Sequence, residues 1–412
     1  MATFQKVKIK DIGRVITGKT PPTTKREFFD GDFPFITPSD IPNYKVRRSN
    51  IAERTLSETW KNKAKNYILP KNAICYVCIG STIGKSCVID KVSFSNQQIN
   101  SIICDTDLSD SNFIFYLLKD KLAEIKSIAG SSGSAKGIIN KTMFENFELS
   151  IPNLPTQTRI ATVLSAHDDL IENNEKRIKA LEEMAQLLYA EWFMKFKFIG
   201  HEKVKMVDSG TEYGMVPEGW EIGKISELAD VISGFPFKAS TYQESGKYKI
   251  VTIKNVHDGK FVLNFDSFIN ELPPKLPEAC VLNKGDILLS LTGNIGRICV
   301  VYGTYHVLNQ RVAKLNPLGL NKREYVYLLF RQESFQQKLE AMSNGAAQQN
   351  LSPIQVKDIK VVIPTAKILD DFSKITSKYF DLALSLQENS QNLFQTRDLL
   401  IPQLVTGKRE LK

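Results

Sequence analysis

The sequence predicts an α+β protein in which two repeated domains of mixed helix and strand are separated by two long helices. Three observations predict this fold: a heptad pattern in the middle of the chain, a second near its end, and an internal repeat with an offset of about 212 residues. The length of 412 residues agrees, because a chain of this size exceeds what one hydrophobic core usually serves.

The first heptad pattern predicts a helix over residues 156–199. No proline or glycine interrupts this segment, and Pro155 before it and Gly200 after it are typical of a helix start and end. His167 and Asn174 fall on the seam, where packing or a polar contact that fixes the register is favoured over catalysis. The spacing of the apolar residues is that of a coiled coil, and those expected to pair are Leu164, Ile171, Ile178, Leu181, Leu188 and Trp192.

The second pattern predicts a helix over about residues 367–400, within a segment 365–412 that ends in a short tail. Ser390 and Arg397 interrupt its seam. Two seams in one chain can bury each other in a pseudo-twofold, antiparallel coiled coil that would hold one domain at each end. The residues expected to pair with the first helix are Phe372, Tyr379, Leu386, Leu393 and Leu400.

The internal repeat places the two domains at residues 1–155 and 221–364. IKDIGRVITG at 9–18 is matched by ISELADVISG at 225–234, and the glycine turn STIGK is matched by GNIGR. Each copy then ends in a short strand with Ile-Pro, and a long helix follows. Short apolar runs separated by Gly, Pro and Ser predict several strands in each domain. The polar, aperiodic segment 200–220 is expected to be a linker.

Composition points to an ordinary soluble protein, with 42% hydrophobic and 24% charged residues. The longest apolar runs are too short to cross a membrane and the N-terminus lacks the apolar core of a signal peptide, so a cytoplasmic location is expected.

The six cysteines lie mostly in apolar, strand-like runs and are expected to be buried free thiols. Cys75 and Cys78 form a CxxC, but on a strand they would face opposite sides, which argues against zinc.

The net charge of +9 is unevenly distributed. Residues 1–155 carry +7, whereas residues 156–198 carry −1. Basic clusters in the first domain could neutralise phosphates, although a basic surface is also a common solubility feature.

The motifs do not favour catalysis. IGSTIGKS at 79–86 has one residue too few for a phosphate-binding P-loop and is followed by a strand-like run, so it is expected to be a tight turn between strands. No methyltransferase or nucleotide-binding signature is present, and four histidines offer little material for acid-base chemistry. We therefore expect no enzyme activity, no metal and no cofactor on this chain.

Polar loops beside glycines are the candidate DNA-binding segments, because Asn and Gln can pair with adenine edges and Arg or Lys with guanine. The alternative is that they are ordinary solvated loops. The two copies agree in their scaffold and differ most here, as expected if they read different sequences. The first-domain candidates are Lys19, Thr20, Lys25, Arg26, Thr37, Ser39, Lys45, Arg47, Arg48, Lys63, Lys85, Gln97, Gln98, Ser131, Ser134 and Lys136. The second-domain candidates are Lys238, Thr252, Lys254, Asn255, Asn294, Arg297, Gln310, Arg311, Asn344, Gln348, Gln349 and Asn350.

Taken together, these segments resemble the specificity subunit of type I DNA restriction-modification systems over nearly the whole chain. The resemblance rests on the duplicated opening, the STIGK and GNIGR turns, the Ile-Pro ends, the PTQTRIATVL start of the first helix and the closing LLIPQLVTGK. The second helix departs from the pattern, since its start, TAKILDDF, lacks the proline and glutamine of the first.

The resemblance implies two target recognition domains, each reading one half of an asymmetric, bipartite sequence in double-stranded DNA, with the helices as spacer. It also implies a non-catalytic chain that docks two methyltransferase subunits and, through them, restriction/translocase subunits. S-adenosylmethionine, ATP and Mg²⁺ are then expected on those partners. The alternative is a structural adaptor that binds only protein through its coiled-coil rod. Neither the target bases nor the spacer length can be read from the pattern.

Overall fold

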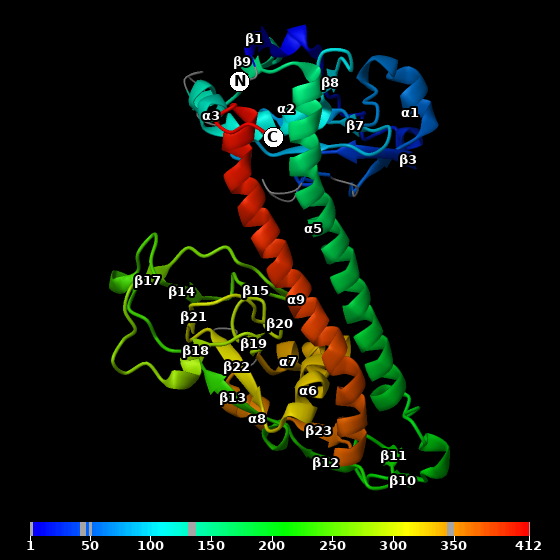
Figure 1. Ribbon diagram of the computed structural model, residues 1–412. Helices are drawn as coiled ribbons and strands as arrows, with labels where there is room; N and C mark the ends of the chain where they lie inside the picture. Colours follow the sequence, from blue (N-terminus) through cyan, green and yellow to red (C-terminus); the bar gives the residue numbers. More distant parts are fainter. Residues whose placement is uncertain (1–2, 42–46, 49–51, 131–136, 344–349, 412) are drawn as a thin grey trace. The chain divides into compact units, whose positions relative to one another are not determined.

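The computed structural model describes residues 3–41, 47–48, 52–130, 137–343 and 350–411. The chain divides into two compact units: unit 1 comprises residues 1–173 and 390–412, and unit 2 comprises residues 174–389 (Figure 1). Each unit therefore contains one globular domain and one end of each long helix.

The domain of unit 1 is built on a four-stranded antiparallel sheet. Its strand order is β2 (Gly13–Thr17), β8 (Ile99–Cys104), β5 (Ile74–Val77), β6 (Ser86–Val88). A smaller sheet has the order β4 (Thr55–Leu56), β3 (Phe29–Ile36), β7 (Phe94–Ser95), and β1 (Gln5–Lys8) pairs with β9 (Glu148–Ile151). The described residues of the domain also form the helices α1 (Glu58–Lys63), α2 (Ser111–Asp120), α3 (Leu122–Gly130) and α4 (Lys141–Glu145).

The domain of unit 2 repeats this topology. Its main sheet has the order β13 (Ala229–Ser233), β22 (Val312–Pro317), β19 (Ile287–Ser290), β20 (Ile298–Val300), and β12 (Glu221–Lys224) pairs with β23 (Lys360–Ile363). The smaller sheet has the order β17 (Phe268–Ile269), β14 (Tyr248–Val251), β21 (His306–Leu308), β18 (Val281–Leu282). The remaining elements are the hairpin β15 (Val256–His257) and β16 (Lys260–Phe261), with α6 (Arg323–Phe330), α7 (Glu333–Ser343) and α8 (Pro353–Lys357). The matching strand orders confirm the internal repeat.

The main sheet of unit 1 is buried on both faces. Along β5, Ile74 and Tyr76 enter one apolar cluster with α2, and Cys75 and Val77 enter another. This alternation follows from the two-residue period of a strand. Cys78 joins the first cluster, so the two cysteines of the CxxC do face opposite sides, as expected.

The first long helix, α5 (Leu154–Tyr189), begins and ends earlier than its sequence pattern predicts. The Asn153 side chain accepts the Thr156 amide at 3.1 Å, so Pro155 lies in the first turn. A π-helical turn, Ala190–Met194, follows α5, and Phe196 adopts a positive φ of 57°. The reason is tertiary: Phe196 and its neighbours turn back to pack around Trp220.

The second long helix, α9 (Ala366–Val405), extends beyond the expected end and contains Pro402. In unit 1, the start of α5 and the end of α9 share one core through Leu164 and Leu404. In unit 2, the end of α5 and the start of α9 pack through Trp192 and Phe372, whose ring centroids lie 5.6 Å apart. The helices therefore pair antiparallel in each unit, and the expected fold class is confirmed.

The predicted seam residues face inward to different degrees. Five of them are buried: Leu164, Ile171, Trp192, Phe372 and Leu386. The others are half-buried: Ile178, Leu181, Leu188, Tyr379, Leu393 and Leu400. Asn174 donates to Asn389 across the seam at 3.0 Å, which is the polar contact expected of a seam asparagine. His167 is half-buried, and its Nδ1 lies 2.9 Å from the carbonyl oxygen of Val163.

Arg397, which interrupts the predicted seam, is the centre of a buried charge network in unit 1. Its side chain is 1% exposed and forms ion pairs with Asp168 of α5 and with Asp398. Tyr116 of α2 donates to the same Asp168, and Arg47 forms an ion pair with the adjacent Asp169. We call Arg397, Asp168, Tyr116, Arg47 and Asp169 the Arg397 cluster. It joins the domain to both helices.

The Arg397 cluster alters the titration of its neighbours. Burial, followed by the charge of Asp168, raises the pKa of Tyr116. Burial, followed by the positive charge of Arg397, lowers the pKa of Lys119 to about 7. Protonated Tyr116 is therefore a permanent donor to Asp168.

The segment 200–220 is more ordered than a linker. Within it, β10 (Met206–Asp208) and β11 (Met215–Pro217) form an antiparallel hairpin. The Tyr213 hydroxyl donates to the carbonyl of Lys360, which ties the hairpin to β23.

The buried ion pair predicts a large loss of stability when one partner is removed. Arg397→Met should lower the free energy of unfolding of unit 1 by about 3 kcal/mol, because Asp168 would remain buried without its cation. Urea unfolding followed by amide hydrogen exchange in α2 would measure this. Arg397→Met combined with Asp168→Leu should recover most of the loss.

The matched control is Lys179→Met, which removes an exposed i,i+4 pair with Glu183 and should cost less than about 0.5 kcal/mol. Equal losses for Arg397→Met and Lys179→Met would contradict a structural role for the Arg397 cluster.

Candidate nucleic-acid interface

The candidate DNA-binding loops of unit 1 meet at one end of its main sheet. Strand β2 ends where β8 begins and where β5 turns into β6. The parallel strands β3 and β7 also end here. We call the four loops at this end the unit 1 edge: residues 18–20, 37–40, 79–85 and 96–98.

Hydrogen bonds hold the loops of the unit 1 edge together. The Lys19 amide donates to the Ser95 carbonyl at 2.8 Å, and the Cys78 amide donates to the Gln98 carbonyl at 2.8 Å. The Thr20 hydroxyl donates to Gln97 Oε1 at 2.5 Å. Candidate residues 77 positions apart in the sequence therefore lie side by side.

The β5–β6 connection is the tight turn that the sequence predicts. It joins two antiparallel strands, which is incompatible with a P-loop that must open into a helix. Gly84 has a φ of 92°, and a Cβ at this position would lie 2.0 Å from Leu122 Cδ1. The positive φ favours glycine here, whereas the Leu122 methyl is the end of a flexible side chain that could move aside.

Unit 2 gathers its candidates at the same end of its own main sheet. Its loops follow β13, β14, β19 and β21, and we call residues 234–238, 252–255, 292–297, 309–311 and 350 the unit 2 edge. The Gln310 amide donates to the Phe235 carbonyl at 3.1 Å, and the Leu291 amide donates to the Arg311 carbonyl at 3.1 Å. Thr292 donates to Asn350 Oδ1 at 2.8 Å.

Most described candidates at the two edges are accessible. The exposed ones are Lys19, Thr20, Ser39, Gln97, Lys238, Lys254, Asn294, Gln310, Arg311 and Asn350. Half-buried candidates are Thr37, Lys85, Gln98, Thr252 and Arg297. These side chains supply the donors and acceptors that direct readout of base edges requires.

Three further candidates are exposed but lie elsewhere in unit 1. Lys25 and Lys63 stand over the ring of Phe28, at 5.7 and 5.1 Å from its centroid, and Arg26 is next to them in the chain. They form a small basic cluster on η2 (Arg26–Phe28) and α1, apart from the unit 1 edge.

Two candidates are buried and serve the fold. Arg47 is 4% exposed and belongs to the Arg397 cluster, so its guanidinium is not available to a phosphate. Asn255 is 1% exposed, donates to the carbonyls of Val262 and Asn264, and accepts the Thr252 amide. Because these bonds occupy its amide group, Asn255 shapes its loop and cannot also pair with a base edge. Arg48 is half-buried and pairs with Asp90.

Several candidates lie outside the described residues. They are Lys45, Ser131, Ser134, Lys136, Asn344, Gln348 and Gln349.

The sequence pattern does not single out four exposed leucines on the long helices. Leu170 and Leu399 lie in unit 1, and Leu382 and Leu187 lie in unit 2. Their exposed fractions run from 40% to 68%. The signal that could have identified them is the repeat, because Leu382 and Leu399 stand 212 positions after Leu170 and Leu187.

The chemical groups in the described part of the chain do not form a metal centre. No set of three or more His, Cys, Asp or Glu side chains there is arranged to hold a metal ion. The six cysteines are free, and all but Cys104 are buried. No helix in the same residues is long and apolar enough to cross a membrane.

Comparison with known proteins identifies the family. The type I restriction modification DNA specificity domain matches residues 1–183 and 217–392. The MjaIX specificity subunit of a type I restriction enzyme of Methanocaldococcus jannaschii is 30% identical over 97% of this chain and 92% of its own length. The MjaVIII specificity subunit of the same organism is 27% identical over 99% of this chain and 93% of its own length.

The fold agrees with a solved structure. A type I restriction-modification system S subunit from M. genitalium superimposes with a TM-score of 0.61 at 17% sequence identity, covering 100% of this chain and 97% of that one. The family domain matches most of the chain, and its two matched regions contain the two repeated domains. The chain belongs to the family of type I restriction-modification DNA specificity subunits.

Proposed function

We propose that this chain reads an asymmetric, bipartite DNA sequence, one half with each edge, and carries methyltransferase and restriction subunits to that site. The observation that supports this most is that two domains of the same topology present different polar residues at the same sheet end. Gly18 is followed by Lys19 in unit 1, whereas the matching Gly234 is followed by Phe235 in unit 2. One scaffold with two different edges suits the reading of two different half-sites.

The charge of the chain supports contact with a phosphate backbone. The net charge is +9, and exposed basic residues stand at both edges, including Lys19 in unit 1 and Lys238 and Arg311 in unit 2. Basic residues position a protein on DNA without reading its sequence, whereas Gln and Asn beside them can read base edges. The edges combine both kinds of side chain.

The exposed leucines support docking of two copies of one partner. Leu170 and Leu399 in unit 1 are the repeat equivalents of Leu382 and Leu187 in unit 2, so each unit offers one leucine on each helix. Large exposed apolar side chains at repeated positions favour two equivalent contacts. We infer that each unit binds one methyltransferase subunit, and that S-adenosylmethionine, ATP and Mg²⁺ act on the partners. The expected location is the cytoplasm, where host DNA is accessible.

If the unit 2 edge reads base sequence, a substitution in it should alter the recognition of one DNA half-site only. Arg311→Ala, in a complex with the matching methyltransferase, should relax selection at bases of one half-site and weaken binding there by about 1–3 kcal/mol. Selection from a random duplex library at fixed salt, read by sequencing the bound fraction, would show this.

The control for Arg311→Ala is Lys224→Ala, at the opposite end of the repeat unit, on β12 and paired with Asp358. It should leave both half-sites unchanged. If the wild-type complex binds all duplexes equally at matched salt, the chain is a protein adaptor and not a sequence reader.

A spacer role for the helices predicts a change in half-site separation. Seven residues inserted into both α5 and α9 lengthen each helix by about 10 Å, at 1.5 Å per residue. The tolerated DNA spacer should then grow by up to about 3 base pairs, at 3.4 Å each. Methylation mapping of host DNA would report the new spacing. Altered half-site sequences at an unaltered spacing would refute the spacer role.

Docking through the leucines predicts a change in stoichiometry. Leu170→Ser with Leu399→Ser should leave the free chain folded and remove one of two bound methyltransferase subunits, because each buried leucine contributes about 1.5–3 kcal/mol. Native mass spectrometry would count the subunits. Leu320→Ser, at a 90% exposed position of unit 2 that is not on a long helix, is the control. Retention of two partners by the double variant would exclude these leucines from the interface.

A further inference from the structure

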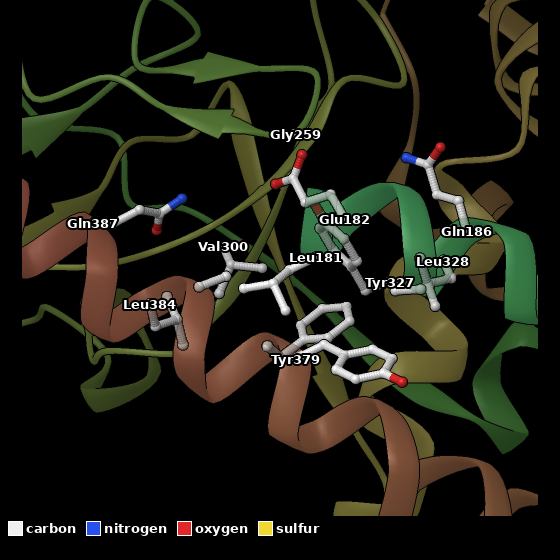
Figure 2. Close-up of a pocket in the computed structure, with 13 residues that line it drawn as sticks. Leu181, Glu182, Gln186, Gly259, Val300, Tyr327, Leu328, Tyr379, Leu384 and Gln387 are labelled. Carbon is white, nitrogen blue, oxygen red and sulfur yellow. The ribbon is translucent and has the colours of Figure 1, made fainter. Parts of the chain in front are cut away.

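An open pocket in unit 1 lies where the start of α5 meets the segments before β1 and after α9. Its volume is about 240 Å³, and Phe4, Ile160 and Leu404 supply its apolar wall. None of the described residues that line it belongs to the unit 1 edge. The cavity between α5, α6 and α9 in unit 2 is much smaller, about 30 Å³ (Figure 2), which is room for roughly two waters.

The walls of the unit 1 pocket are held by contacts within the chain. The Arg159 side chain donates from Nη2 to the carbonyl of Leu411 at 2.9 Å, which ties the last described residue to α5. Gly407 has a φ of 74°, and a Cβ at this position would lie 2.5 Å from a ring carbon of Phe4. The ring of Phe4 therefore lies directly on the turn that follows α9.

The repeat shows what surrounds the residue equivalent to Phe4 in unit 2. Phe4 directly precedes β1 and Trp220 directly precedes β12, and these strands form the same antiparallel pair in each unit, with β9 and β23 respectively. Trp220 is 6% exposed, because three phenylalanine rings pack around it. The centroids of Phe193, Phe196 and Phe198 lie 5.8, 5.6 and 5.3 Å from that of Trp220. In unit 2 the chain itself thus fills this place with aromatic rings.

Unit 1 has smaller side chains at the equivalent place. Its helix pair has Ile160 and Leu404 at the positions of Phe372 and Trp192 in unit 2. The segment after α9, residues 406–411, contains no aromatic residue. Phe4 is half-buried and is the only aromatic residue among the described residues that line the pocket. The space that rings occupy in unit 2 is therefore open in unit 1.

The rim of the pocket is basic. Arg159 and Arg409 are exposed there, and neither forms an ion pair within the described part of the chain. Glu410 is the one carboxyl group among the described lining residues. Thr156 brings the first turn of α5 to the wall, where the partial positive charge of a helix start adds to that of the guanidinium groups. The rim therefore favours a carboxylate, which arginine can bind at two points.

We propose that the unit 1 pocket is a docking site for an aromatic side chain with an acidic residue beside it, supplied by another protein. The ring packs on Phe4, Ile160 and Leu404, as the phenylalanine rings of unit 2 pack on Trp220. The acidic residue pairs with the guanidinium groups at the rim. The pocket has room for a ring, because a cavity of about 150 Å³ already admits benzene. The site does not depend on the DNA-reading function proposed above.

Three short peptides test this chemistry with the full chain: Glu-Phe-Glu, Glu-Ala-Glu and Lys-Phe-Lys, each acetylated and amidated at its ends. Titration calorimetry should give a Kd of about 1 mM or tighter for Glu-Phe-Glu, as expected for a small ligand at an open site. The other two peptides should bind at least about fivefold more weakly, because one lacks the ring and the other has the wrong charge. Equal binding of Glu-Phe-Glu and either of the others would overturn the proposal.

Two exposed residues beside each other test the rim. Arg409→Gln should weaken the binding of Glu-Phe-Glu at least about fivefold, because it removes a charged donor to the carboxylate. Lys408→Gln, one position earlier and outside the pocket lining, should change it less than about twofold, since salt screens a more distant charge. Equal effects of the two variants would contradict docking at this pocket.

A filled pocket tests the location of the ring. Thr156→Trp should place an indole in the pocket from within the chain and abolish the binding of Glu-Phe-Glu, with the fold checked by circular dichroism. Thr158→Trp, exposed on the same helix and outside the pocket lining, is the matched control and should leave binding unchanged. If Thr156→Trp does not fold, the comparison of Arg409→Gln with Lys408→Gln decides.

Sedimentation of the free chain tests the source of the occupant. The chain should remain monomeric, because the proposed ring comes from another protein. A dimer that Thr156→Trp dissociates and Thr158→Trp does not would assign the pocket to a second copy of this chain, and would overturn supply by another protein. Neither result depends on which DNA sequence the complex reads.

Discussion

The structure depends on the burial of two apolar helix faces against each other. Each of α5 and α9 has an apolar face that a few polar residues interrupt, and in each unit the other helix packs against this face. The two helices run antiparallel in both units: Leu164 lies near Leu404 in unit 1, and Trp192 lies near Phe372 in unit 2. Each domain then packs onto this pair, so domain and helices share one core.

Polar residues within this seam make the two units unlike each other. Unit 1 has Arg397 in a network with Asp168 and Tyr116, whereas unit 2 has Ala185 beside Phe380 and Tyr327 at the equivalent positions. The attraction within such a buried ion pair is largely offset by the cost of removing both charges from water, whereas removal of one partner alone is strongly destabilising. In unit 2, where apolar residues stand at the equivalent positions, a cavity lies between the two helices, and Gln387 Oε1 has no hydrogen-bond partner within the described part of the chain.

The loops at the edges follow a different constraint from the seam. Strands β5 and β19 beneath them are fully buried, and their residues are mostly apolar in both copies. The loops carry no such restriction and can differ freely, as Gln97 and Gln98 in unit 1 and Gln310 and Arg311 in unit 2 illustrate. A fixed scaffold with variable edges allows specificity to change without a change of fold.

The sequence alone determined the two long helices, the internal repeat and the turn at Gly84, because heptad spacing, a repeated pattern and a glycine can be recognised in the sequence itself. Tertiary structure decided the rest. The helix α5 ends at Tyr189 because the aromatic residues after it pack around Trp220, and residues within 200–220 form a hairpin. Tertiary structure also placed Arg47 and Asn255 in the interior. The sequence does not show that Asp169 pairs with Arg47, or that a loop carbonyl accepts a hydrogen bond from Asn255. Whether such a polar side chain is buried depends on interaction partners that are distant in the sequence, and only the folded structure shows which residues these are.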